Sequence, residues 1–435
     1  MERIIEDLKQ YKQLELIQHL EKLSLIKQEK LIKSITNLDK AFSIYSLSKM
    51  NENNASSNDK ITAAKHFDIE DASNKEELFK LGIEALKNGE VAILLLAGGQ
   101  GTRLGHNGPK GTYSIGLPSG KSFFQLQAEQ LTYMKTLTGK SIPWYIMTSL
   151  ENNYDTIKTF KENNYYGLEE SAINFFIQDE LPIISFNGDL LLKNDTEILK
   201  GSNGNGGVFE SLIKSDNIKR MKNQGVKWLF IYGIDNMLVK VADPYFIGFT
   251  IKSGLDCSSK SVKRLDPEEN GGVFCYRNNK PSILEYTEID DEIKYSVDDN
   301  GELKYNDLNI LCHMIKLDAL ENIAKEELPY HRAIKSYEVL SENGKNKVEK
   351  GYKFEMFIFD IFNKLQDMAI MRVNRELEFL PVKNKSGKDS AEVAREVYLE
   401  LSKNWLIKQG TSKNIQDNKE VEIPITTLWY KNSLD

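Results

Sequence analysis

Leucine and isoleucine recur every three or four positions between residues 2 and 50, among many Lys and Glu residues, as in Leu14, Ile17 and Leu20. This spacing places the apolar side chains on one face of a helix. It predicts two or three amphipathic helices. The polar run from Asn51 to Lys60 shows no such periodicity and predicts an exposed loop, which is the first candidate domain boundary.

Short β-rich runs alternate with helical runs from residue 91 onward. The β-rich runs are VAILLLA, PWYIMTS, INFFIQ and KWLFIYGID, and SFFQLQAEQLTYMK is typical of the helical runs between them. This alternation predicts a mostly parallel sheet with helices on both faces. In that architecture ligands bind beyond the carboxyl ends of the strands.

Weaker patterns predict further elements. Ser73 and Glu76 form a capping-box pattern, which predicts a helix from there to Asn88. GGVFCY and SILEYTEI predict strands, and FEMFIFDIFNKL predicts a helix with an apolar face. AEVAREVYLELSKNWL predicts a helix, and the tail VEIPITTLWY predicts β structure.

Composition and charge narrow the function classes. The chain has 435 residues, 40% of them hydrophobic, and a formal net charge of −7. A nucleic-acid partner or an anionic membrane surface is not expected, because both select for a basic face. The first residues are charged and contain no apolar stretch of signal-peptide length, and no apolar run reaches the roughly 20 residues of a membrane helix. We therefore expect a cytoplasmic protein. Its three cysteines, Cys257, Cys275 and Cys312, show no metal or disulfide spacing and are expected to be reduced.

The strongest chemical motif follows the first β-rich run. The segment GGQGTRLG begins at Gly98 and contains Arg103, and it is followed by Pro109-Lys110-Gly111. Glycines let the backbone N–H groups approach a phosphate, and Arg and Lys add fixed positive charge. The motif outlines a cradle for a triphosphate; the alternative is an ordinary glycine-rich turn between a strand and a helix.

Two common phosphate loops do not fit this sequence. In the dinucleotide pattern G-x-G-x-x-G, Leu104 stands where the third glycine belongs. A Walker loop ending at Gly120-Lys121-Ser122 would need a glycine where Ile115 stands. Lys121 is therefore interpreted as a turn or helix-start residue.

At this point a family resemblance becomes specific. LLLAGGQGTRLG, the following PKG and IGLPSGKSFFQLQAEQ resemble the signature stretch of UDP-N-acetylhexosamine pyrophosphorylases, within the UTP–sugar 1-phosphate uridylyltransferase family. Further blocks are similar in the same order: FFIQDELP, GNGGVFESL, YGIDNMLVKVADPYFIGF, ILEYTEI, LPYHRAIK, KFEMFIFDIF and FLPVKN. Together they cover roughly residues 90 to 385.

The resemblance implies a glycosyltransferase-A-like, Rossmann-type α/β fold, with a central mixed sheet flanked by helices, a helical N-terminal part and a small C-terminal domain. The expected boundaries are a helical region over residues 1–60, a catalytic nucleotidyltransferase domain over 61–385 and a small α+β domain over 386–435.

The resemblance also assigns nucleotide contacts by position. Gly98, Gly99 and Gln178 would contact the uracil or the ribose, and Gly206 would close the nucleotide pocket. Gln178 has both a donor and an acceptor, which suits the imide edge of uracil. Without the family context it would be an ordinary polar residue at a strand end.

Three cations match the residues of the family that act on the phosphates. The resemblance implies catalytic roles for Arg103 and Lys110 beside the β- and γ-phosphates, and for Lys383, which would reach the phosphate from the other side. An isolated lysine such as Lys383 is usually only solvated, so its role depends on the resemblance.

Asp235 is the candidate metal ligand and also a nucleotide-site residue. It ends the apolar run WLFIYGID, and Mg²⁺ prefers oxygen ligands while keeping waters and substrate phosphates. The resemblance implies Mg²⁺ as cofactor. The alternative is a turn or N-cap aspartate, and a second protein carboxylate for the metal is not evident.

The sugar site is also assigned by resemblance. Gly272, Glu285, Tyr286 and Asn309 would surround the hexose hydroxyls, and Phe357 and Phe359 would lie against the acyl group or the ring. From the helical pattern alone, the two phenylalanines would be core residues. The run LCH after Asn309 departs from the more polar, aromatic run of the family. The preferred hexose therefore stays open.

These observations favour a uridylyltransferase that converts UTP and N-acetylglucosamine 1-phosphate, or a related N-acetylhexosamine 1-phosphate, to a UDP-sugar and pyrophosphate. The alternatives are a UDP-glucose or broad-specificity UDP-sugar pyrophosphorylase and a non-catalytic UDP-sugar-binding regulator. The expected partners are UTP and a sugar 1-phosphate, without nucleic acid or membrane, and the expected state is a monomer or weak homo-oligomer.

Overall fold

The chain divides into two compact units. The computed structural model describes residues 2–51, 59–286, 288–326, 328–341, 344–410 and 420–430. The first unit, here called the hairpin unit, comprises Met1–Asp59, Gln178–Ser211 and Glu327–Asp360, and the second, the sheet unit, comprises Lys60–Ile177, Leu212–Glu326 and Ile361–Asp435. Most of the predicted loop from Asn51 to Lys60 lies outside the described residues. The predicted boundaries at residues 60 and 385 stay a prediction.

A mixed sheet forms the centre of the sheet unit. Its main path has the order β2-β18-β12-β15-β11-β3-β4-β5. The neighbours β11, β3, β4 and β5 run parallel, whereas β15 is antiparallel to both β11 and β12. The strands are β2 (Phe67–Asp68), β18 (Ala369–Arg372), β12 (Cys257–Lys263), β15 (Asp307–Lys316), β11 (Trp228–Gly233), β3 (Val91–Leu96), β4 (Trp144–Thr148) and β5 (Ile173–Ile177). Off this path, β13 (Val273–Arg277) pairs with β15, and β1 (Ile61–Ala63) and β14 (Lys280–Leu284) pair with β13. The four predicted β-rich runs are all strands of this sheet, and the mixed sheet that the resemblance implied is confirmed.

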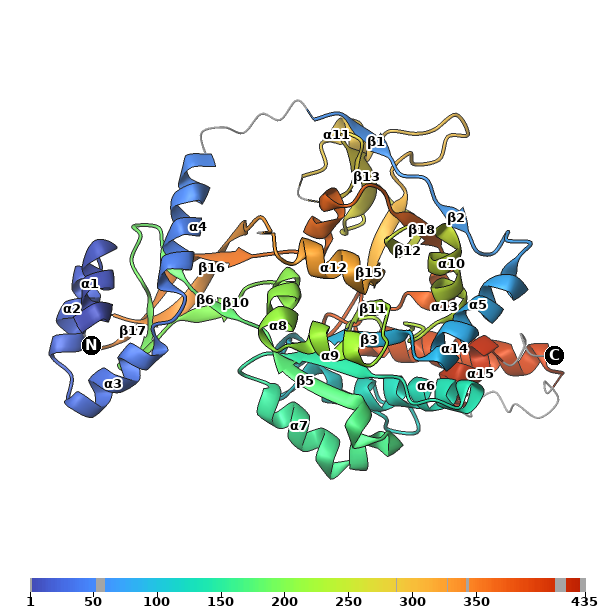
Figure 1. Cartoon of the computed structure of the whole chain (residues 1–435), viewed down its shortest axis with the longest axis horizontal. Helices are drawn as coiled ribbons and strands as arrows, with labels where there is room; N and C mark the ends of the chain where they lie inside the picture. The colour runs from blue at the N-terminus through green and yellow to red at the C-terminus, as the bar shows by residue number, and fades with distance from the viewer. Residues whose placement is uncertain are drawn as a thin grey trace. The chain divides into compact units, whose positions relative to one another are not determined.

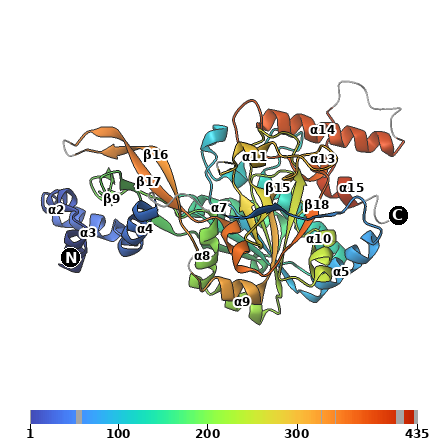
Figure 2. The same cartoon turned by 90° about the horizontal axis from the view of Figure 1, so that it is seen from above.

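Helices flank this sheet. Figure 1 shows α5 (Lys75–Asn88) and α10 (Pro244–Ser253) side by side on one side of the strands, and α9 (Asn217–Asn223) and α12 (Leu317–Ile323) on the other. The remaining α-helices of the unit are α6 (Phe123–Thr138), α7 (Asn153–Glu162), α11 (Asp291–Lys294), α13 (Arg375–Glu378), α14 (Ala391–Lys408) and α15 (Ile425–Tyr430), several of which Figure 2 shows from above. The boundary between the two units falls within α8 (Val208–Lys214). Strand β3 is fully buried between these layers, which explains its unbroken run of Val, Ala, Ile and Leu. Cys257, Cys275 and Cys312 are buried and not bonded to one another, as expected.

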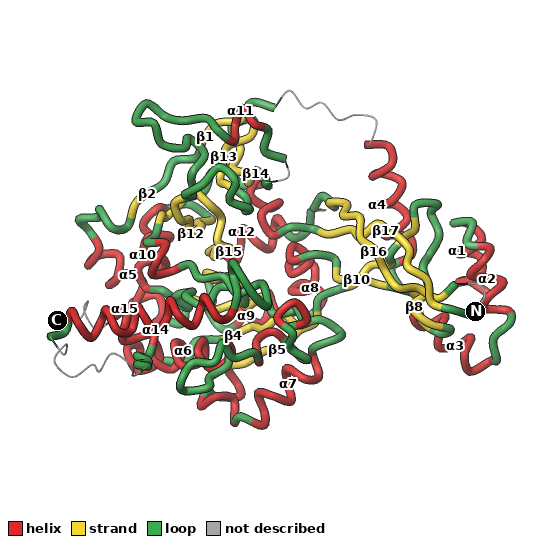
Figure 3. Tube along the Cα trace, turned by 180° about the vertical axis from the view of Figure 1, so that it is seen from behind, coloured by secondary structure: helices red, strands yellow, loops and turns green. Residues whose placement is uncertain are grey.

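The hairpin unit combines four N-terminal helices with a long β-hairpin. The helices are α1 (Glu2–Gln10), α2 (Leu14–Glu21), α3 (Leu25–Ser34) and α4 (Leu38–Asn51), and the hairpin pairs β16 (His331–Leu340) with β17 (Asn346–Glu355), as Figure 3 shows. The short strands β6 (Glu180–Pro182), β7 (Ile184–Ser185), β8 (Leu192–Asn194), β9 (Glu197–Ile198) and β10 (Lys200–Ser202) complete the unit. Helix residues such as Ile17 and Leu20 pack with Tyr352 and Phe354 of the hairpin in one core. The sequence predicted two or three helices, and the structure has four; two of the three breaks between them contain a residue with a positive φ angle, Lys12 and Asn37.

Two local predictions of secondary structure are wrong. FEMFIFDIFNKL is the end of β17 followed by the 3₁₀ helix η6 (Ile358–Lys364), not an α-helix. Its apolar residues also fit a period of two, and Phe354, Met356 and Ile358 are the buried set. The tail 425–430 is helical rather than β, because Pro424 starts a helix whose end buries Trp429 and Tyr430.

The capping prediction is off by one residue. Helix α5 begins after Asn74, so Ser73 does not occupy the N-cap position. The helix ends as predicted at Asn88, where Gly89 adopts the left-handed conformation with φ 73°.

Candidate functional site

The glycine-rich segment leaves β3 at the carboxyl edge of the sheet and folds back on itself. The amide of Gly101 donates to the carbonyl of Gly108 at 2.9 Å, and the amide of Lys110 donates to the carbonyl of Gly99 at 3.2 Å. A Cβ atom at Gly101 would lie 2.7 Å from the His106 side chain, so this tight loop requires glycine there. A Cβ atom at Gly99 would meet nothing within 4 Å, so the loop faces open space at that position. Within the described residues, the amides of Gly98 and Gly99 have no hydrogen-bond acceptor, which suits an anion site.

A residue that the sequence analysis did not select holds this loop in place. The side chain of Asn152 is fully buried, and its Nδ2 donates to the carbonyls of Ala97 at 2.9 Å and Gly99 at 3.2 Å. Its Oδ1 accepts from the amide of Ser149. No motif in the sequence marks Asn152, because its partners are backbone atoms of a distant segment.

Lys110 and Asp235 meet at the edge where β3 and β11 end. The Lys110 Nζ lies 2.5 Å from the Asp235 Oδ1. The Lys110 side chain is only 10% exposed, whereas that of Asp235 is 47% exposed. A lysine is rarely buried unless it is paired, so this cation is held in a defined position by a carboxylate that still faces solvent.

Strand register brings further predicted residues to the same edge. In the parallel pair β11 and β3, Gly233 lies opposite Leu96. Two residues beyond these strand ends stand Asp235 and Gly98, both at the carboxyl edge of the sheet. In the antiparallel pair β11 and β15, the last paired residues are Tyr232 and Cys312, and β15 is irregular between Cys312 and Asn309, where Leu311 has a φ of 53°.

The segment that carries Lys383 is bonded to the Asp235 turn. The amide of Val382 donates to the Asp235 carbonyl at 2.9 Å, and the amide of Met237 donates to the Leu380 carbonyl at 2.9 Å. The side chains of Lys383 and Arg103 are both exposed. The structure therefore brings the backbone of Lys383 to the Lys110–Asp235 pair, while Arg103 projects into solvent from the glycine loop.

Three of the predicted sugar-site residues form a cluster on β13, β14 and β15. The amide of Asn309 donates to the carbonyl of Gly272 at 2.9 Å. A Cβ atom at Gly272 would lie 2.8 Å from the Glu285 Oε1, so any side chain there would displace Glu285. Tyr286 follows Glu285 and is 51% exposed. The run LCH is not part of this cluster's polar surface, since Cys312 and His313 are buried in the sheet.

The other predicted residues gather in the hairpin unit. The Nε2 of Gln178 donates to the carbonyl of Gly204, and the amide of Gly206 donates to the Met356 carbonyl at 2.9 Å. A Cβ atom at Gly206 would lie 2.7 Å from the backbone of Phe357, so this contact excludes larger residues.

Phe357 and Phe359 are stacked and half-buried. Their ring centroids are 5.0 Å apart with an interplanar angle of 19°. They are neither core residues nor part of a helical stripe, so the apolar-stripe interpretation of these two residues is wrong. His331 contacts the Phe357 ring, and its Nε2 lies 3.0 Å from the Asp360 carboxylate.

The described residues contain no group of three or more His, Cys, Asp or Glu side chains that could hold a metal ion. A divalent cation at this edge would therefore depend on Asp235 and on ligands from the substrate. The geometry is compatible with Mg²⁺, because only Oδ1 of the half-exposed carboxylate is paired with Lys110 and Mg²⁺ commonly uses one or two carboxylates with substrate phosphates and waters.

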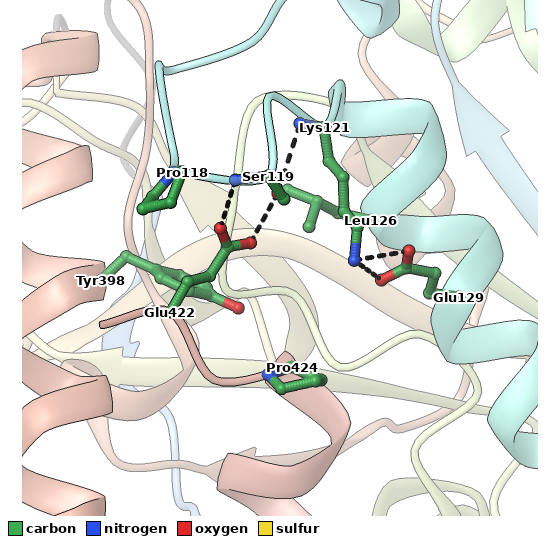
Figure 4. A pocket seen from close by; sticks show the side chains of 8 residues that line it. All are labelled: Pro118, Ser119, Lys121, Leu126, Glu129, Tyr398, Glu422 and Pro424. Atoms are coloured by element: carbon green, nitrogen blue, oxygen red, sulfur yellow. Dashed lines mark hydrogen bonds and ion pairs between the residues drawn. The ribbon is translucent and has the colours of Figure 1, made fainter. Parts of the chain in front are cut away.

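A separate pocket of about 320 Å³ lies beside α6, between the loop before this helix and the C-terminal segment. As Figure 4 shows, Glu422 accepts hydrogen bonds from the backbone and hydroxyl of Ser119, and Lys121 pairs with Glu129. None of the predicted site residues lines this pocket. Lys121 stands directly before the N-cap of α6, as predicted, and is engaged in this ion pair.

The fold and this edge define a class of protein that binds a phosphorylated ligand, because a glycine loop, a buried cation and a carboxylate meet at the carboxyl edge of an α/β sheet. Residues 37–432 match the family described as UTP--glucose-1-phosphate uridylyltransferase. The match covers most of the chain, and the chain belongs to this family. The family match makes this class the nucleotidyltransferases.

Individual relatives agree with this assignment. The chain is 38% identical over 370 residues to the UDP-N-acetylglucosamine pyrophosphorylase of Saccharomyces cerevisiae, covering 82% of this chain and 77% of the yeast protein. It is 39% identical over 356 residues to UDP-N-acetylglucosamine diphosphorylase 2 of Arabidopsis thaliana, covering 78% and 70%. Among solved structures, the uridine diphosphate N-acetylglucosamine pyrophosphorylase from Trypanosoma brucei, in complex with an inhibitor, superimposes with a TM-score of 0.80 at 29% identity, covering 95% of this chain and 88% of that one.

Proposed function

We propose that this chain transfers the uridylyl group of UTP to N-acetylglucosamine 1-phosphate, or to a related N-acetylhexosamine 1-phosphate, and releases pyrophosphate. The observation that carries the proposal is the Lys110–Asp235 pair beside the glycine loop, in a chain of the uridylyltransferase family. The names of the relatives at 38–39% identity support N-acetylglucosamine as the sugar.

In this reaction an oxygen of the sugar 1-phosphate attacks the α-phosphorus of UTP. A new oxygen–phosphorus bond forms, the bond from the α-phosphorus to the bridging oxygen breaks, and pyrophosphate leaves. The nucleophile is already an anion, so no general base is required, and catalysis consists of alignment and neutralisation of charge. We assign this neutralisation to Lys110 and Arg103 on the departing phosphates and to Lys383 on the opposite side.

Mg²⁺ is part of this proposal. Asp235 would hold it together with substrate phosphates and waters, where it would neutralise phosphate charge. The loop amides of Gly98 and Gly99 would contact the nucleotide. Gln178 and Gly206 stay our candidates for further nucleotide contacts, and Gly272, Glu285, Tyr286, Asn309, Phe357 and Phe359 stay candidates for the sugar.

We also propose a cytoplasmic location and a monomer or weak homo-oligomer. None of the described helices combines the length and apolar character needed to cross a membrane.

A substrate panel tests the proposal. The full chain is incubated with UTP and, in turn, the 1-phosphates of N-acetylglucosamine, N-acetylgalactosamine, glucose and galactose, with Mg²⁺ or with a chelator. We expect the fastest pyrophosphate release with N-acetylglucosamine 1-phosphate and little release with the chelator. A preference for glucose 1-phosphate would favour the alternative that the family description suggests, and no release with any sugar would indicate a binding protein instead of an enzyme.

A further inference from the structure

Two peptide segments meet beside the candidate phosphate site, and each carries a predicted site residue. The first is the turn after β11, which carries Asp235, and the second is the segment from Glu378 to Lys383. Two backbone hydrogen bonds and an isolated β-bridge between Asn236 and Pro381 join them. The distance between the charge of Lys383 and the Lys110–Asp235 pair depends on this junction.

The side chain of Asn236 completes the junction. It is 5% exposed, and its Nδ2 donates to the Glu378 carbonyl at 2.7 Å. Its Oδ1 accepts from the amide of Leu380 at 2.9 Å and from the amide of Leu238 at 3.2 Å. One short side chain thus binds both ends of the Glu378–Leu380 peptide run and its own turn, so neither segment can shift without breaking one of these bonds.

The side chain of Glu378 fixes the second segment from the other direction. Its Oε2 lies 2.5 Å from the Nζ of Lys260, and its Oε1 lies 2.9 Å from the Nζ of Lys240. Lys260 is 1% exposed and also pairs with Asp243, which caps α10. Burial disfavours the charged form of Glu378, but Lys240 and Lys260 outweigh burial and lower its pKa. The segment is therefore held by a paired group of four charges, of which Glu378, Lys260 and Asp243 are buried and Lys240 is half-buried.

The C-terminal helix adds a third attachment. The Nε1 of Trp429 in α15 donates to the carbonyl of Leu377, one residue before Glu378, at 3.1 Å. The segment is thus attached to β12, α10, α15 and the β11 turn before the chain reaches the exposed Lys383. Surface lysines need no such arrangement, whereas a lysine that must meet a developing charge does.

We propose that Asn236 and Glu378 are positioning residues, which hold Lys383 at a fixed place relative to the Lys110–Asp235 pair. The inference rests on the proposed function, in which Lys383 neutralises phosphate charge. Asn236 and Glu378 themselves touch protein groups and act through Lys383. A displacement of about 1 Å at a reacting centre costs on the order of 10²-fold in rate.

A double-mutant cycle tests this coupling. Single-turnover rates and KM for both substrates are measured for the full chain, for Asn236→Ala, for Lys383→Ala and for the double variant. We expect Asn236→Ala alone to lower the single-turnover rate about 10- to 100-fold, with a smaller change in KM. In the Lys383→Ala background the same substitution should lower the rate less than about threefold, because the charge that it positions is gone.

The matched control is Tyr232→Phe. Tyr232 lies in β11, the strand that precedes Asp235, and its hydroxyl donates a buried hydrogen bond of 3.0 Å to Gln127 in α6. The substitution removes this bond, which does not involve the Lys383 segment. Tyr232→Phe should therefore lower the single-turnover rate by the same factor in the unaltered chain and in the Lys383→Ala background. If Asn236→Ala reduces folding yield, Asn236→Ser replaces it in the cycle, because its shorter side chain keeps a polar group and adds no charge beside Asp235.

The outcomes separate the two proposals. A full-sized effect of Asn236→Ala in the Lys383→Ala background overturns the positioning role and leaves the assignment of Lys383 intact. A near-normal rate for Lys383→Ala alone overturns that assignment, and the positioning role with it. A second cycle uses Glu378→Gln, whose rate loss should also disappear in the Lys383→Ala background. The same rate loss in both backgrounds would contradict a positioning role for Glu378.

Discussion

Replacement of Lys110 by Met separates a role in turnover from a role in folding. The side chain is nearly buried, and its Nζ pairs with the half-exposed Asp235 carboxylate at 2.5 Å. Met has a similar length and keeps the apolar part of the lysine packing, so the substitution mainly removes the charge.

The two expected magnitudes differ. The lost ion pair is exposed on the Asp235 side and contributes on the order of 1 kcal/mol to folding after solvent screening. For a chain of this size that corresponds to a decrease in Tm of roughly 2–4 °C at most. A fixed cation that stabilises charge in the transition state contributes about 10²-fold or more in rate, which is about 2.7 kcal/mol. Turnover should therefore fall far more than stability.

Single-turnover pyrophosphate release and thermal melting measure the two quantities on the same samples. Lys121→Met is the matched control, since Lys121 is a nearby lysine paired to Glu129 at 2.7 Å in a pocket without predicted site residues. We expect the control to turn over within about threefold of the unaltered chain. A Lys110→Met variant with a near-normal rate, or one whose rate loss merely follows its loss of folded protein, would refute the reasoning.

Three further predictions concern other parts of the chain. Gly206→Ala places a Cβ atom 2.7 Å from the Phe357 backbone. It should raise the KM for UTP about tenfold and lower the free energy of unfolding by about 1–3 kcal/mol, and unchanged steady-state kinetics would contradict this. Asn152→Ala removes the donor to the Gly99 carbonyl and should cost about 1–3 kcal/mol in denaturant unfolding, together with weaker UTP binding; binding at full affinity would show that the loop is held by other bonds. Burial lowers the pKa of His313 from 6.5 to about 3, so the unfolded state binds more protons between these values. The contribution of His313 to stability is therefore complete above pH 6.5 and is lost as the pH falls toward 3, by up to about 1.4 kcal/mol per pH unit, and His313→Gln should flatten this dependence in urea titrations; an identical pH profile would reject it.

The central sheet was predictable because its strands carry unambiguous patterns. The fully apolar run at β3 and the glycines after it exclude a helix and require a strand followed by a tight loop. The end of β17 was misassigned as a helix because FEMFIFDIF has apolar residues at both helical and alternating spacing. Only the packing of Phe354 and Met356 in the hairpin unit decides between the two periods.

Residues of the site were predictable to the extent that their chemistry lies in local sequence. Lys110 and Asp235 follow a glycine loop and an apolar strand, and both come after the carboxyl ends of the neighbouring parallel strands β3 and β11. Asn152 and Asn236 were not predictable, because each acts through backbone atoms that are distant in sequence. Lys260 was also missed, since a lysine in a serine-rich strand gives no sign that buried carboxylates surround it.

In the proposed reaction the loop after β3 binds the triphosphate of UTP, and a crystal of the full chain soaked with UTP and Mg²⁺ would reveal where the nucleotide lies. We expect phosphate density against the amides of Gly98 and Gly99 and within reach of the Lys110 Nζ. Nucleotide density at a different place, with this loop unliganded, would contradict it.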